Sequence, residues 1–249
     1  MKNLIRAELM RLRTTRMVYG LLLGMSGSVA LRIAGSILAD AQARSSPLNT
    51  ADGVASVLSS AGSGAIFVLV LGILCLAGEF RHNTVTSTFL TTPDRRRVLA
   101  AKLASASLVG VAFGVAGSVL TLAIAVPWLT AKGVDLGLIG HQVGLAVAGA
   151  LLTTALYGLV GVGIGALVRN AVAAVAGALV WMAIIENLVV SLRPQVGKWL
   201  PGGAASALAR EATPAGGLLP MWAGGALLLG YAIAFAVVGT RFVLERDVT

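Results

Sequence analysis

The chain has 249 residues, of which 57% are hydrophobic and 12% are charged. A water-soluble domain carries about 25% charged residues, so this composition excludes a soluble globular protein. The 19 Lys and Arg residues against 10 Asp and Glu residues give a formal net charge of +9. In so apolar a chain, this excess indicates cytoplasmic flanks of membrane helices and not a nucleic-acid partner.

Six apolar stretches are long enough to cross the membrane as helices, which takes about 20 residues each. They lie at 17–39, 55–77, 103–126, 143–168, 171–192 and 218–240. All are rich in Leu, Ala, Val and Gly, and none shows the two-residue alternation of a membrane β-barrel strand. The sequence therefore predicts an all-α membrane protein, with residues 1–249 forming a single transmembrane domain.

The distribution of basic residues predicts the orientation of the chain. With the N-terminus inside, most of the Lys and Arg residues lie at the cytoplasmic face, as the positive-inside rule requires. We predict a multi-pass protein of the cytoplasmic membrane with both termini in the cytoplasm.

Residues 1–16 carry two stripes at helical spacing, one apolar and one basic. The apolar stripe is Ile5, Leu9 and Leu12, and the basic stripe is Lys2, Arg6 and Arg13. This pattern predicts an amphipathic helix on the inner face of the membrane. The alternative is a plain basic anchor that only fixes the orientation of the first span.

Two charged residues interrupt the predicted spans, Arg32 in the first and Glu186 in the fifth. Each lies about 22 Å from the cytoplasmic end of its helix, at 1.5 Å per residue. Because charges within a membrane are costly, we hypothesise that the two form an ion pair, within one chain or across a dimer. The alternative is that Arg32 snorkels outward alone while Glu186 is protonated or faces water.

Residues 78–102 form the longest predicted cytoplasmic connection. Val85 and Phe89 are four residues apart among threonines, which allows a short helix with one small apolar face. Such an element fits a groove on a cytosolic partner, and an ordinary polar loop is the alternative. Thr92, Pro93 and Asp94 resemble an N-cap followed by a first-turn proline and acid, so we expect the third spanning helix to start there.

The outer connection contains a segment, 199–210, that is too apolar for a free loop. Trp199 and Leu200 precede Pro201 and an alanine-rich run. The segment predicts a short helix that dips into the outer leaflet, with Trp199 at the membrane interface.

Several kinds of catalytic chemistry lack their sequence patterns. No P-loop is present, so the chain has no nucleotide site of that type. The two histidines, His82 and His141, fall on opposite sides of the predicted membrane and cannot share a metal. We find no nucleophile that can be paired with a base. The sequence therefore predicts a protein that is not an enzyme and holds no cofactor or metal itself.

Glycines recur four residues apart within the predicted spans. These pairs are Gly20/Gly24, Gly110/Gly114, Gly140/Gly144 and Gly161/Gly165. In membranes this spacing allows two helix backbones to approach closely, so we expect these positions to pack against neighbouring helices.

Residues 78–102 resemble permease subunits of ATP-binding-cassette transporters of the ABC-2 type. The similarity rests on Gly78-Glu79-Phe80-Arg81-His82-Asn83-Thr84, on Leu90-Thr91-Thr92-Pro93, on Arg95-Arg96-Arg97 and on Val98-Leu99-Ala100-Ala101-Lys102. Trp199-Leu200-Pro201-Gly202-Gly203-Ala204-Ala205 is similar to the segment that these permeases place before their last span. The six spans and the basic N-terminal helix also match the family.

The resemblance implies an exporter fold and a partner that hydrolyses ATP. The chain would pair with a second permease, identical or related, and bind two cytosolic ATPase subunits that carry ATP and Mg. Residues 81–92 would form the coupling helix, 1–16 the connecting helix and 199–210 a re-entrant outer segment. The implied ATPase-coupling residues are Glu79, Arg81, His82, Val85, Phe89 and Arg169.

The family most often exports hydrophobic or amphipathic molecules, so such a substrate is the expectation here. A carrier that works without a partner and a structural membrane subunit are the alternatives. Membrane lipids are expected as partners in every case, and nucleic acid in none.

Overall fold

The computed structural model describes residues 2–40, 48, 50–81, 95–168, 170–210, 217 and 219–245, and these form helices with no strand among them. The first half contains α1 (Lys2–Thr14), α2 (Arg16–Asp40), α3 (Ala51–Leu58), the 3-10 helix η1 (Ser59–Gly64), α4 (Ala65–Arg81) and α6 (Arg95–Ala131). The second half contains α7 (Leu136–Leu167), α8 (Ala171–Val180), the π-helical turn η2 (Trp181–Ile185), α9 (Glu186–Leu192), α10 (Pro194–Gly197), α11 (Pro201–Ala209) and α12 (Met221–Glu245).

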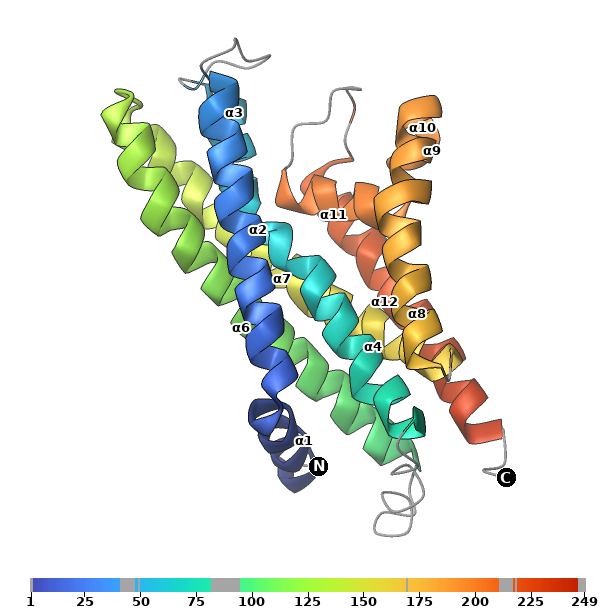
Figure 1. Ribbon diagram of the computed structural model, residues 1–249. Helices are drawn as coiled ribbons and strands as arrows, with labels where there is room; N and C mark the ends of the chain where they lie inside the picture. The colour runs from blue at the N-terminus through green and yellow to red at the C-terminus, as the bar shows by residue number, and fades with distance from the viewer. Residues whose placement is uncertain are drawn as a thin grey trace.

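Six helical segments are long and apolar enough to span a membrane, which confirms the predicted class of multi-pass helical membrane protein. They are Arg16–Leu38, Ala51–Gly78, Arg96–Ala131, Gly137–Leu167, Ala171–Leu192 and Met221–Gly239. The two ends of the chain lie at the same end of the bundle (Figure 1). An even number of spans requires this arrangement.

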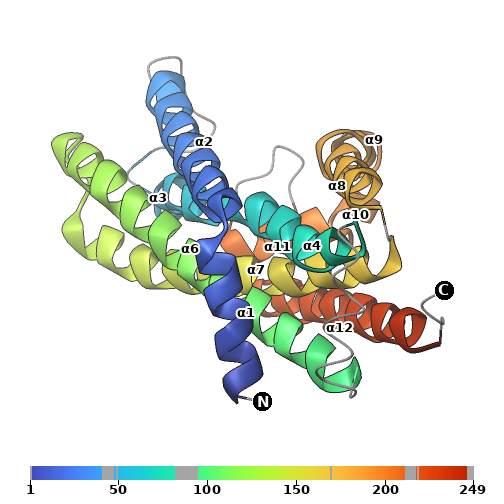
Figure 2. The same cartoon turned by 60° about the horizontal axis from the view of Figure 1, so that its bottom comes forward.

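Helix α7 lies at the centre of the bundle and packs against α6, α4 and α12 (Figure 2). The most buried span is α3–η1–α4, and the least buried is α8–η2–α9. Helix α11 is too short to span a membrane, and it packs against α12 and α7. The bundle therefore has a well-packed centre and carries a loosely packed fifth span at one side.

The second span is interrupted where the sequence predicted a continuous helix. Its middle, Ser59–Gly64, is a 3-10 helix of Ser, Ala and Gly that packs between α6 and α7. Ser and Gly favour the α-helix poorly, and their small size lets neighbouring backbones approach. A Cβ on Gly117 of α6 would lie 2.8 Å from the carbonyl oxygen of Ala61. The change of helix type therefore coincides with a backbone contact.

The fifth span is also interrupted, by the π-helical turn Trp181–Ile185. The side-chain amide of Asn187 donates to the carbonyl oxygens of Met182 at 3.1 Å and Ala183 at 3.0 Å. A polar side chain thus satisfies carbonyl groups in a segment surrounded by apolar residues. Such π-turns often occur at functional positions of helices.

The four glycine pairs differ in what lies next to them. Gly110 and Gly114 of α6 face the backbone of α7, and Gly161 and Gly165 of α7 face the backbone of α4. Gly24 faces only the ring of Phe67. No atom lies within 4 Å of a Cβ built on Gly20, Gly140 or Gly144. Close helix packing therefore explains two of the four pairs.

We expect Gly161→Ala to destabilise the protein by about 1–3 kcal/mol, the usual cost of overpacking a filled core. Its Cβ would contact the carbonyl oxygen of Leu69 and lie 3.0 Å from Cα of Gly72, and neither backbone atom can move independently. Thermal unfolding in detergent measures the effect. Gly144→Ala, on the same helix but facing open space, is the matched control and should cause no loss. Equal stability of both variants would contradict the proposed backbone contact.

Candidate functional site

The end of the molecule that carries both termini also carries α1, the end of α4 and the beginning of α6 (Figure 1), and both α1 and α4 pack against α6. Helix α4 ends at Arg81 and α6 begins at Arg95, so the predicted coupling segment 81–92 connects these two helices. His82, Val85, Phe89 and Arg169 lie outside the described residues. Glu79 and Arg81 belong to the last turn of α4, but their side chains lie outside the description as well. Their coupling role stays a prediction.

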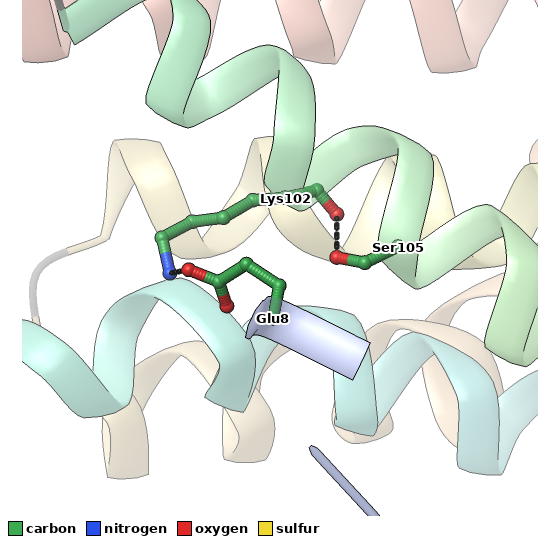
Figure 3. Close-up of polar contacts among 3 residues, drawn as sticks. All are labelled: Glu8, Lys102 and Ser105. Carbon is green, nitrogen blue, oxygen red and sulfur yellow. Dashed lines mark hydrogen bonds and ion pairs between the residues drawn. The ribbon is translucent and has the colours of Figure 1, made fainter. Parts of the chain in front are cut away.

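A buried ion pair joins α1 to α6 at this end. The Nζ atom of Lys102 lies 2.9 Å from Oε1 of Glu8, and the two side chains are 1% and 12% exposed (Figure 3). On α6, the hydroxyl of Ser105 donates to the carbonyl oxygen of Lys102 at 3.0 Å. A charge withdrawn from water is costly unless it is paired, so each partner requires the other.

Apolar packing accompanies the ion pair. Leu12 of α1 is buried in a cluster with Met25 and Val29 of α2 and Phe113 of α6. The apolar stripe predicted to face the membrane therefore packs against the protein, at least at this residue. Because α1 is held by both charge and packing, it is fixed to the first turns of α6.

A second polar arrangement lies at the other end of the bundle, where α11 begins. Oε1 of Glu186 accepts hydrogen bonds from the N–H groups of Gly202 at 2.5 Å and Gly203 at 3.3 Å. Glu186 is 5% exposed. The first N–H groups of a helix have no partner within it, and they carry the positive end of its dipole. The carboxylate of α9 thus caps α11.

The structure does not bring Arg32 and Glu186 together within one chain. Helices α2 and α9 lie apart from each other in both views (Figures 1 and 2), and Arg32 is exposed on α2 whereas Glu186 is buried against α11. Equal depth along two helices did not determine which way each side chain faces. A pair across two copies of the chain stays a prediction.

The other end of α11 is also anchored. Arg210 ends the helix with a left-handed backbone (φ 57°), and its Nη1 donates to Oε1 of the buried Gln142 on α7 at 2.5 Å. The hydroxyl of Tyr231 on α12 donates to the carbonyl oxygen of Trp199, just before α11, at 3.0 Å. Three spanning helices, α7, α9 and α12, therefore hold the predicted outer segment 199–210 by polar contacts.

Sequence reasoning did not identify Glu8, Gln142 or Gly202 as site residues. Glu8 had a signal, because it is the sole acid among the first 39 residues. Gly202 had no signal in the sequence. Glycine is needed there because a Cβ would lie 2.7 Å from the carboxyl carbon of Glu186, and only the folded structure shows this contact. Gln142 is one polar residue among several near a helix end, and its partner is 68 residues away.

The described residues contain no group of three or more His, Cys, Asp or Glu that is arranged to hold a metal ion. No protein-family model matches the chain, and no curated protein matches it in sequence.

The fold and the two polar arrangements define a multi-pass helical membrane protein. One helix is anchored by polar contacts at each end of the bundle, α1 at one end and α11 at the other.

Proposed function

We propose that the chain is the permease subunit of an ATP-binding-cassette exporter of the ABC-2 type. A separate ATPase would hydrolyse ATP, and the chain would pair with a second permease. The resemblance of residues 78–102 and 199–205 to that family supports the proposal. So does the bundle of six candidate spans.

The observation that carries the proposal is the Glu8–Lys102 ion pair near the beginning of α6, the helix that follows the predicted coupling segment in the chain. Segment 81–92 leads into α6, which is fixed to α1 by this buried pair only a few residues after its start at Arg95. Force applied to the segment by an ATPase would therefore move α1 together with α6. Since α1 runs directly into α2, the motion would also reach the first span.

The outer end fits the same proposal. Helix α11 is anchored at its N-terminus by Glu186 and just beyond its C-terminus by Gln142. In an exporter, this segment would close the outer end of the pathway until α7 or α9 moves. We place the pathway between the two permease copies.

A hydrophobic or amphipathic substrate suits the apolar character of the described spans best. Lys102 and Glu186 are the only charged residues buried within the described part of the chain, and each already has a hydrogen-bonded partner. A strongly charged cargo would need buried counter-charges. The substrate class is part of the proposal.

Affinity purification from the native membrane in mild detergent, followed by mass spectrometry, tests the proposal. We expect a P-loop ATPase to copurify with the wild-type chain and to be lost with Phe89→Asp, which places a charge on the small apolar face of the predicted coupling helix. Ser87→Asp adds the same charge about 200° around a helix and is the matched control, which should retain the ATPase.

Two outcomes would contradict the proposal in different ways. Absence of any ATPase under conditions that preserve membrane complexes would favour a carrier without a partner or a structural subunit. Retention of the ATPase by the Phe89→Asp variant would remove the coupling role from segment 81–92.

A further inference from the structure

The outward face of α1 carries a compact stripe of positive charge. Lys2, Arg6 and Arg13 are all exposed. Their spacings of four and seven residues place them within a narrow arc of the helix. They are spread over about 16 Å along the axis, at 1.5 Å per residue.

The charge of this stripe is not balanced by its own helix. Glu8 is the sole acid of α1, and its carboxylate is turned inward to Lys102. The ion pair that fixes α1 to α6 therefore leaves only cations on the outward face. An anionic partner would meet no repulsion from a carboxylate of α1.

The apolar residues of α1 are largely unavailable for membrane insertion. Leu12 is buried against α2 and α6, and Ile5 and Leu9 are half-buried. The exposed large apolar residue of this helix is Met10, at 67% exposure. Any attachment of α1 to the bilayer must therefore depend mainly on charge.

The position of α1 places the stripe at the level of the lipid headgroups. Lys102, which Glu8 contacts, lies in the second turn of the candidate span Arg96–Ala131. Helix α1 ends at Thr14, two residues before the span Arg16–Leu38 begins. Both relationships place α1 where spanning helices leave the hydrocarbon. Clusters of Lys and Arg at that level attract anionic phospholipids.

We propose that Lys2, Arg6 and Arg13 bind the phosphate headgroups of anionic phospholipids in the leaflet next to α1. Each cation near an anionic surface strengthens binding roughly fivefold, so the three together give on the order of a hundredfold preference for anionic lipid. Exposed charges are screened by salt, so the preference should fall as ionic strength rises. The proposal does not depend on an ATPase or on transport.

Native mass spectrometry tests this after reconstitution of the full chain into mixed phosphatidylcholine and phosphatidylglycerol vesicles. The ratio of bound phosphatidylglycerol to phosphatidylcholine is compared between wild type and Lys2→Gln/Arg6→Gln/Arg13→Gln. We expect the ratio to fall at least tenfold at low salt. The unfolding temperature should stay unchanged, because all three side chains are exposed.

The matched control is Lys132→Gln/Arg193→Gln/Lys198→Gln, which removes the same charge at the opposite end of the bundle. This variant should keep the wild-type ratio. An equal fall in both variants would overturn the proposal, because it would indicate general charge attraction. No preference for phosphatidylglycerol in the wild type would also overturn it. An acidic protein surface would then be the remaining partner for the basic stripe.

Discussion

Replacing Glu186 by leucine is expected to detach the beginning of α11 from the fifth span. The change leaves the N–H groups of Gly202 and Gly203 without their acceptor. Each unsatisfied buried N–H group costs about 1–3 kcal/mol, and loss of the charge at the helix N-terminus adds to this. Glu186→Gln keeps an acceptor oxygen in the same place and should preserve most of the contact.

Cysteine labelling measures the detachment directly. The chain has one cysteine, Cys75, so Cys75→Ala gives a background in which Leu208→Cys places a single thiol on the buried face of α11. We expect Glu186→Leu to raise the labelling rate by a water-soluble maleimide at least tenfold, since 1.4 kcal/mol corresponds to a factor of ten. An unchanged rate would mean that Glu186 does not hold α11.

Gly202→Ala provides an independent check of the same contact. Its Cβ would lie 2.8 Å from both carboxylate oxygens of Glu186, so the carboxylate must shift. Gly230→Ala, with nothing within 4 Å, is the matched control. We expect faster labelling of Leu208→Cys only with Gly202→Ala.

Removing one partner of the Glu8–Lys102 pair is expected to destabilise the protein by about 3 kcal/mol, because the other charge stays buried without compensation. Glu8→Ala and Lys102→Ala should each show this loss in denaturant unfolding in detergent. Arg13→Gln, an exposed charge on the same helix, is the control and should change stability by less than about 0.5 kcal/mol.

Double variants separate the pairing from simple loss of side-chain volume. Glu8→Leu with Lys102→Met replaces the pair by apolar groups and should be close to wild type in stability. The charge swap Glu8→Lys with Lys102→Glu should recover most of the loss seen in either single change. Failure of both double variants would show that the two residues act separately.

The sequence by itself predicted the helical membrane class and the number of spans, because about 20 consecutive apolar residues have few other stable locations. It did not predict where the helix type changes within a span. The Ser59–Gly64 and Trp181–Ile185 interruptions were missed, since apolar length is insensitive to a local change of helix type. For the Trp181–Ile185 interruption, the available signal in the sequence was Asn187, which lies next to Glu186, the sole acid of that span.

The partners of charged residues required the tertiary structure. Depth along a helix follows from residue number, so Arg32 and Glu186 were placed inside their spans, but depth did not identify the groups that Glu186 contacts. Glu186 instead caps a helix that begins 15 residues later, and Lys102 pairs with Glu8 across 94 residues. The direction in which a side chain faces depends on how whole helices pack against one another. That packing is decided by contacts between residues far apart in the sequence, such as Gly161 of α7 against the backbone of α4.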